Sequence, residues 1–306
     1  MKSLPSSRIL ATAGFGLLLV GSSSGAVVVQ ELFDGITSSD SSINGKGDTA
    51  TSIGLTGNWA TNVNTGIYTA GNFDSGAGLP GLPASNGVKG GVWNNTGGNY
   101  DPAIYATRPL AAPINFAVAQ TVYFSVILNN SGDTAMGIGL ASGASGSSEF
   151  IGAGLTWNNA RTLSTQVNDA GNAAYVSYGT LGADSGPYGV RNHEASGSIN
   201  GPALLVGRIT ISTTGADLID IKRYGVGSTI ESDPSLVTWT ASDSFNTSMV
   251  ANNLVLWLNG NSGNNAGEVD AIRFGQSWGD VTGVPETGSA LLGLLGAAMF
   301  FRRQRR

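Results

Sequence analysis

Thr121 to Leu128 reads TVYFSVIL, and this stretch decides the fold class. Every second position in it is apolar, which is the period of a β-strand with one face in a core. The four on that face are Val122, Phe124, Val126 and Leu128. Most of the stretch is β-branched or aromatic, as a pleated and half-buried surface favours. The segment predicts a β-strand.

Seven further short runs have the same character and are separated by turns rich in Gly, Asn, Ser and Asp. They are Val27–Phe33, Ala174–Tyr178, Leu204–Ile211, Asp217–Tyr224, Leu236–Thr240, Asn253–Leu258 and Val269–Phe274. Residues 37–52 and 76–91 are rich in Gly, Ser and Asn and are expected to be long surface loops. No segment has the pattern of a long amphipathic helix. Short strands with turns between them predict an all-β sandwich whose first and last strands pair.

The composition agrees with a folded β domain. The chain has 306 residues, of which 46 are Gly, 41% are hydrophobic and only 11% are charged. This length is enough for a sizeable core, and so much glycine disfavours long helices. There is no cysteine, which excludes disulfides, thiolate catalysis and Cys-ligated metals.

The charge is distributed unevenly along the chain. Six of the 15 basic residues lie in the two terminal segments. Residues 27–286 keep 9 basic residues against all 20 acidic ones, a net charge of −11. A domain of this charge does not attract nucleic acid or an anionic membrane through its overall field.

The N-terminus has the three parts of a secretory signal peptide. Lys2 and Arg8 give a positive start, and Ile9–Val20 is an apolar run too short for a spanning helix. Ser24-Gly25-Ala26 fits the small-x-small pattern of signal peptidase. We expect residues 1–26 to be removed after Ala26 by signal peptidase, once the export machinery has engaged them.

The C-terminus carries the most specific motif of the sequence. Val284-Pro285-Glu286 is followed by the apolar stretch Ser289–Phe301, which is too short to cross a bilayer comfortably. Arg302, Arg303, Arg305 and Arg306 then close the chain and are expected to stop it at the cytoplasmic headgroups. The segment is typical of a pause signal during export, with processing beside Pro285.

This tail resembles the PEP-CTERM sorting domain, a Pro-Glu-Pro-like motif before a short apolar helix and an Arg-rich end. The resemblance covers residues 284–306 and implies recognition by an exosortase, a membrane-embedded processing enzyme. Thr287 stands where the family usually has its second Pro. The same residues, VPETG, also resemble the LPxTG motif of sortase substrates, so a sortase-type wall-anchored protein is an alternative.

The order of segments between the two ends resembles the concanavalin A-like lectin/glucanase jelly roll, including its laminin-G-like members. The resemblance rests on Glu31–Gly35, Tyr123–Val126 and Glu268–Gly275. It implies a concanavalin A-like β-sandwich over residues 27–283, flanked by an N-terminal signal helix and a short C-terminal apolar helix. A fold by itself implies no activity.

Catalytic residues are not evident in the sequence, and we expect the protein not to be an enzyme. A glycosidase needs two facing carboxylates. Glu268 and Asp270 are the nearest local match to the E-x-D-x-x-E pattern, but Arg273 replaces its last acid and the match falls in the expected last strand. His193 is the only histidine and lies in a polar, loop-like setting. A glycan-active hydrolase of concanavalin-like fold remains the alternative.

The sequence offers candidate residues for two kinds of binding, glycan contact and calcium coordination. Aromatic rings beside Asn or Gly are candidates for glycan contact, with the filling of the core as the alternative reading: Trp59, Trp93, Tyr100 and Trp157. Oxygen-bearing residues near the end of the domain are candidate calcium ligands, with ordinary turns as the alternative: Asn259, Asn261 and Asp270. No cofactor is expected apart from this calcium.

The sequence therefore predicts an exported protein of the cell surface or extracellular matrix, processed by an exosortase. Its expected role is non-catalytic, with extracellular polysaccharide as the candidate partner and no nucleic acid. Transient membrane anchoring through the C-terminal helix completes the expectation.

Overall fold

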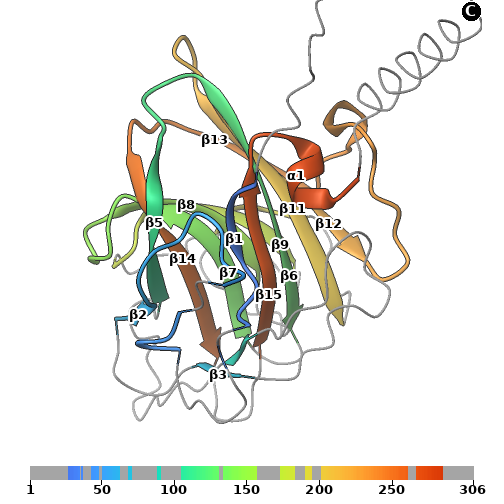
Figure 1. Cartoon of the computed structure of the whole chain (residues 1–306). Helices are drawn as coiled ribbons and strands as arrows, with labels where there is room; N and C mark the ends of the chain where they lie inside the picture. The colour runs from blue at the N-terminus through green and yellow to red at the C-terminus, as the bar shows by residue number, and fades with distance from the viewer. Residues whose placement is uncertain are drawn as a thin grey trace, which may run out of the picture.

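The structure is a computed structural model and describes residues 27–34, 36, 43–47, 50–62, 68–70, 88–90, 105–130, 134–156, 173–182, 190–194, 201–260 and 267–284. Two antiparallel β-sheets pack face to face in it, as Figure 1 shows. The expected all-β sandwich is confirmed. The signal helix and the C-terminal apolar helix lie outside the described residues.

The first sheet contains both the earliest and the latest strand of the domain. Its strands are β1 (Val27–Glu31), β3 (Tyr68–Ala70), β4 (Val88–Gly90), β6 (Gln120–Asn130), β11 (Pro202–Ile211), β12 (Asp217–Gly225), β13 (Ala241–Phe245) and β15 (Gly267–Gly275). They are ordered β13-β12-β11-β6-β15-β4-β3, and β1 pairs with β15 beside β4. The expected pairing of first and last strands is therefore observed, with Val29 opposite Phe274 and Glu31 opposite Ile272.

The second sheet consists of the other strands of the described structure. They are β2 (Ala60–Thr61), β5 (Tyr105–Asn115), β7 (Thr134–Ala141), β8 (Glu149–Leu155), β9 (Ala174–Thr180), β10 (Val190–His193) and β14 (Val250–Gly260). Their order is β10-β9-β8-β7-β14-β5-β2. The edge strands β10 and β13 meet, because the Asn192 amide donates to the carbonyl of Ser242 at 2.5 Å.

The main core fills the space between the sheets and explains the period-two pattern. Val122, Phe124, Val126 and Leu128 of β6 all point into it. The alternate residues of β6 face outward, and the outer face of the first sheet is itself partly covered. A short helix, α1 (Trp278–Thr282), and the segment around the 3-10 turn η1 (Pro234–Leu236) pack on it.

Two local expectations were wrong. Residues 236–240 do not form a strand: the Asp233 side chain accepts from the Ser235 amide at 2.7 Å, and Pro234 starts η1. The strand begins later, at Ala241. Residues 76–91, expected to be one long loop, contain β4 at their end.

Strands β7 and β8 are absent from the sequence-based prediction because glycine occupies their outward positions. Gly137 and Gly152 lie under the ring of Trp257, and a Cβ on either would come within 2.3 Å and 2.7 Å of ring atoms. The indole nitrogen of Trp257 donates to the hydroxyl of Tyr175 at 2.8 Å. Glycine here makes room for a buried ring on the outer face of the second sheet.

Candidate functional site

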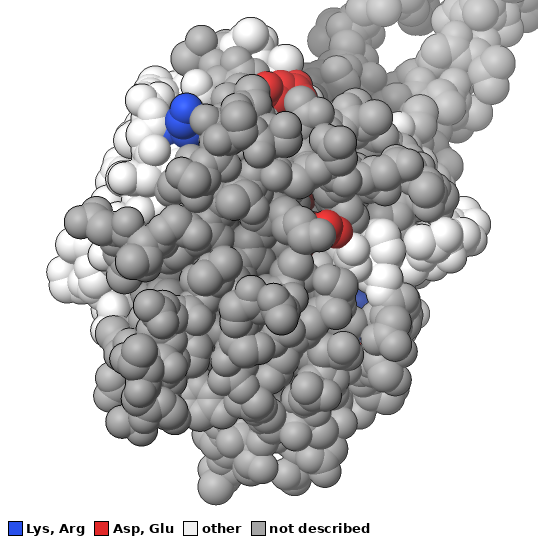
Figure 2. Space-filling view, turned by 90° about the horizontal axis from the view of Figure 1, so that it is seen from below, with Lys and Arg blue, Asp and Glu red and all other residues white. Residues whose placement is uncertain are grey.

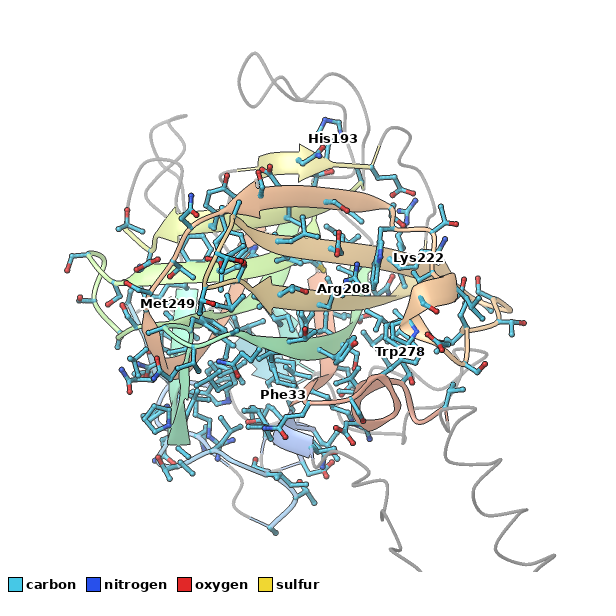
Figure 3. All side chains as sticks on the ribbon, turned by 90° about the horizontal axis from the view of Figure 1, so that it is seen from above. Phe33, His193, Arg208, Lys222, Met249 and Trp278 are labelled. Carbon is cyan, nitrogen blue, oxygen red and sulfur yellow. The ribbon has the colours of Figure 1, made fainter. Side chains whose placement is uncertain are left out.

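The outer face of the first sheet carries a group of aromatic and charged side chains that solvent can reach in part. We call it the Arg208 face and define it by Tyr123 of β6, Arg208 of β11, Asp220 and Lys222 of β12, Trp239, and Ser242 of β13. Strand alternation places these side chains outward, because their sequence neighbours Phe124, Ile209, Ile219 and Ile221 belong to the inner core. Figure 3 shows Arg208, Lys222 and Trp278 on this side of the molecule.

Arg208 is held in place at one end of its guanidinium group. Its Nε donates to Oδ2 of Asp220 at 2.7 Å, directly across the β11–β12 pair. The other carboxylate oxygen of Asp220 accepts from the Ser242 hydroxyl at 2.5 Å. Asp220 is only 2% exposed, so this support is shielded from water. A buried carboxylate with a donor on each oxygen fixes the orientation of the arginine.

Trp239 supports the same guanidinium from one face. The Arg208 carbon Cζ lies 4.7 Å from the centre of the indole ring, which is a cation–π contact. The Arg208 side chain keeps 28% of its surface exposed. Among the described residues no hydrogen-bond partner is found for its Nη1 and Nη2 atoms. The forked end of Arg208 is thus oriented and open to solvent.

A row of aromatic rings borders Arg208. Trp239 meets the buried ring of Trp278 edge-on, with centroids 6.2 Å apart, and Trp278 meets Tyr123 in the same way at 6.0 Å. The Trp278 indole nitrogen donates to the carbonyl of Glu231 at 2.6 Å, which fastens the row to the segment after β12. Tyr123 and Trp239 are half-buried, so each offers part of a ring to the surface.

Lys222 adds a second cation to the face. It lies two residues beyond Asp220 on β12, opposite Val206, and is therefore the diagonal neighbour of Arg208. Diagonal residues of paired strands are about 7 to 8 Å apart. Within the described part of the chain, its ammonium group makes no ion pair. The carboxylate of Glu231, on the segment after β12, accepts from the hydroxyl of Tyr224 at 2.5 Å.

Among the expected glycan-contact residues, Trp59 is placed in the core. It is 1% exposed and stacks on Phe33 with ring centroids 6.0 Å apart. The expectation that Trp59 contacts glycan was wrong, because the segment of residues 50–62 folds over the end of the sandwich and turns this ring inward. Trp93, Tyr100 and Trp157 lie outside the described residues.

The expected calcium ligands are not brought together by the described residues. Asp270 is fully buried in β15 and accepts from the amide of Ala271 at 2.6 Å. Asn259 belongs to β14, but its side chain is outside the description, as is all of Asn261. Across the described ranges, no group of three or more His, Asp or Glu side chains could hold a metal ion.

The acid pair lies on another strand of the first sheet, β15, and the histidine lies in the second sheet. Glu268 and Asp270 flank the inward Val269, so both carboxylates leave β15 on its outer side. The Asn129 amide donates to Glu268 at 2.7 Å. His193, at the end of β10, bonds through Nδ1 to the carbonyl of Glu194 at 2.7 Å. Both acids are buried, Asp270 completely.

The sorting residues fall mostly beyond the described part. Val284 is its last residue and packs, half-buried, on the cluster formed by α1 and the first sheet. Pro285, Glu286, the four terminal arginines and Ala26 lie outside the description. None of the described helices has both the length and the hydropathy of a membrane-spanning segment.

Arg208, Asp220 and Trp239 were missed by sequence reasoning. The available signal was weak: an Arg and an Asp, each flanked by core residues in strands with period-two apolar patterns. The cross-strand register that sets them opposite each other has no local signature. Figure 2 shows the opposite side of the molecule, seen from below, where the few acidic and basic side chains of the described residues lie apart from one another.

The chain belongs to the class of all-β proteins built as two-sheet antiparallel sandwiches. No family model matches the sequence, and no curated protein is similar to it at the level searched. Solved structures with some likeness include an engineered GH43 glycoside hydrolase with endo-xylanase and exo-arabinofuranosidase activity. It shares 14% identity and a TM-score of 0.41 over 81% of this chain, which spans 42% of that enzyme.

Two other kinds of solved structure are similar at the same distant level. A mutant of the alginate lyase Aly36B in complex with alginate tetrasaccharide shares 10% identity and a TM-score of 0.38, over 67% of this chain and 86% of its own. A legume lectin-like domain from Entamoeba histolytica shares 12% identity and a TM-score of 0.35, over 68% and 89%. Likenesses of this degree concern the arrangement of strands.

One expectation is corrected by this comparison. The sequence-based prediction that the protein is not an enzyme is contradicted, because the first solved structures found are those of a glycoside hydrolase and of alginate lyases. The protein is therefore not described as non-catalytic below.

Proposed function

We propose that this protein is exported and contacts carbohydrate at the cell surface or in the extracellular matrix, through the Arg208 face. The observation that carries the proposal is the half-buried ring of Trp239 beside an oriented and partly exposed Arg208. Sugars have apolar C–H faces and many hydroxyl groups. An aromatic ring with fixed charged hydrogen-bonding groups next to it suits both features.

Carbohydrate binding can be tested with the purified protein on an array of neutral and acidic glycans. The proposal expects binding that falls about tenfold or more in Trp239→Ala, since a ring at the centre of a binding surface contributes on that scale. Leu236→Ala is the matched control, because Leu236 is an apolar residue of the same segment and is 66% exposed. Binding that survives Trp239→Ala unchanged would place the contact elsewhere.

The same preparation can be assayed for cleavage of each glycan that it binds, by the appearance of new chain ends. Such an assay decides whether contact is followed by catalysis. Glu268→Gln is the informative variant if products appear, because Glu268 is the less buried of the two acids on β15.

Export and sorting form the second part of the proposal. It is supported by the sequence of the two termini: the signal pattern ending at Ala26 and the Val284-Pro285-Glu286 motif with its apolar stretch and arginines. We propose an exosortase of the PEP-CTERM system as the processing partner, with a sortase as the alternative. The mass of the protein isolated from the envelope should correspond to a chain that starts at Val27 and lacks Arg306. An intact chain at the surface would contradict this.

A further inference from the structure

We propose that the carbohydrate bound at the Arg208 face is an acidic polysaccharide whose sugars carry carboxylates. This inference rests on the proposed function and specifies its ligand. It follows from the open guanidinium end of Arg208, from the diagonal position of Lys222, and from the negative net charge of the domain.

The open end of Arg208 has the geometry of a carboxylate receptor. Nε is occupied by Asp220, and the stack on Trp239 fixes the plane of the group. Nη1 and Nη2 then form a planar fork directed to solvent. Such a fork binds a carboxylate with two parallel hydrogen bonds. A neutral hydroxyl uses only one donor of the pair and brings no compensating charge.

Pre-orientation makes this fork a better receptor than an ordinary surface arginine. A free arginine loses side-chain rotamer entropy when it binds. Here the Asp220 bond and the Trp239 ring already restrict it before a ligand arrives. Asp220 itself is buried and saturated, since Ser242 donates to its second oxygen. It therefore anchors Arg208, and because its charge offsets that of the guanidinium group, the selectivity for carboxylate comes from the geometry of the fork and from the charge of Lys222.

Lys222 extends the receptor to a polymer. Its position diagonal to Arg208 leaves two cations on one outward face, with one buried anion between them. The carboxylate of Glu231, whose backbone carbonyl accepts from Trp278 in the aromatic row, accepts from the hydroxyl of Tyr224. An acidic polysaccharide with a carboxylate on each sugar presents successive anions, so one chain can reach both cations.

The negative net charge of the whole domain further limits which anionic polymers can bind. Residues 27–286 carry a net charge of −11, which repels polyanions at long range. Duplex DNA, with one charge per 1.7 Å of axis, is strongly disfavoured by this field. A polysaccharide with at most one charge per sugar is repelled less. The local pair of cations therefore selects for moderate charge density, and the bound state should weaken with added salt.

The test compares three polymers with the full-length protein: polygalacturonate, the same polymer with its carboxyls methyl-esterified, and dextran sulfate. The proposal expects binding to polygalacturonate, and affinity at least about tenfold lower for the methyl ester. Arg208→Gln and Lys222→Gln should each weaken polygalacturonate binding, Arg208→Gln by about tenfold or more, the scale of a lost charge-assisted bond. Lys46→Gln removes one positive charge from a distant loop and should leave affinity unchanged.

Stability effects are separated from recognition by Arg208→Lys, which keeps the charge but not the fork. It should bind polygalacturonate as weakly as Arg208→Gln while its thermal midpoint stays closer to that of the wild type. Equal binding of polygalacturonate and its methyl ester, with Arg208→Gln unaffected, would overturn the acidic ligand and leave the proposed function standing. Binding to dextran sulfate alone would assign the face to sulfate and also overturn it. Binding to none of these polymers or to any glycan on the array would remove the proposed function as well.

Discussion

The carboxylate of Glu31 and the guanidinium group of Arg108 form a fully buried ion pair that joins the two sheets. Glu31 is the last residue of β1 in the first sheet, and Arg108 belongs to β5 in the second. Arg108 also donates to the carbonyl of Gly57 at 3.2 Å and to the Ser52 hydroxyl at 2.9 Å. Glu31 accepts in addition from the amide of Phe33 at 2.8 Å. The pair thereby fixes residues 50–62 over this end of the sandwich.

Breaking this pair from the arginine side is expected to be costly. Arg108→Met leaves the Glu31 charge buried without its counter-ion, which costs about 3 to 5 kcal/mol of unfolding free energy. Urea unfolding followed by tryptophan fluorescence measures the change. The double variant Glu31→Gln with Arg108→Met should recover part of the loss, because no lone charge remains. A double variant no more stable than Arg108→Met would show that the charge is not the cause.

The pH dependence of stability should carry the signature of Glu31. Burial raises the pKa of Glu31 above 4.5, and the attraction of Arg108 opposes this only in part. The folded state then holds the Glu31 proton more tightly than the unfolded chain. Its stabilising contribution is complete below about pH 4.5 and is lost as the pH rises through the folded-state pKa.

The measurement compares unfolding free energies of the wild type and Glu31→Gln, which has no titrating proton at this position. The stability of the wild type relative to Glu31→Gln should fall as the pH rises above about 4.5. Arg108→Met should show a larger fall over the same range, since the counter-ion that lowers the pKa is gone. A relative stability that rises with pH would contradict the stated direction.

The glycines beneath Trp257 should be intolerant of a methyl group. A Cβ at position 137 would lie 2.3 Å from a ring atom of Trp257 and 2.4 Å from the carbonyl oxygen of Ala153. We expect Gly137→Ala to cost about 1 to 3 kcal/mol, as overpacking does. Gly215→Ala is the control, because its nearest neighbour would be the Ser212 hydroxyl at 3.7 Å. Thermal unfolding compares the two, and equal midpoints would rule out the packing explanation.

The cap of α1 should determine how firmly this helix covers the first sheet. The Ser277 side chain accepts from the amide of Asp280, and the Asp280 side chain accepts in return from the Ser277 amide. Ser277→Ala should cost about 1 kcal/mol, whereas Ser277→Asp retains an acceptor and should cost less. The α1 helix is also held to β6, because the Ser125 hydroxyl donates to the Val281 carbonyl at 2.7 Å. The backbone amides of α1 should therefore exchange faster in Ser277→Ala. Unchanged exchange would mean that the cap is dispensable.

The strand β6 could be predicted from its apolar alternate positions, whereas β7 and β8, which have glycine at outward positions, could not. The sequence TVYFSVIL of β6 indicates its buried face. Val122 and Phe124 on that face are apolar, whereas Tyr123 and Ser125 on the other face carry hydroxyl groups. TAMGIGLA of β7 carries the same alternation with Gly137 and Gly139 as its outer residues. Glycine is unfavourable in strands on average, and its role here depends on the ring of Trp257, 120 positions further along the chain.

Prediction of the binding residues was limited for a related reason. An aromatic residue beside Asn or Gly is equally compatible with the surface and with the core, and Trp59 proved to be a core residue. Trp239 has a sequence setting no more suggestive than that of Trp59. Its position over Arg208 results from the turn at Pro234 and from the Trp278 ring of α1, on which it packs.

The sequence by itself determined the class of fold, the pairing of the first and last strands, and the inward face of β6, because the alternation of side chains in a strand is a local property of the backbone. The tertiary structure alone decided that Arg208 meets Asp220 and Trp239, and that Glu31 meets Arg108. Such contacts depend on strand register and on the packing of one sheet against the other. Both are set by the sum of many weak interactions over the whole core, and no short segment encodes them.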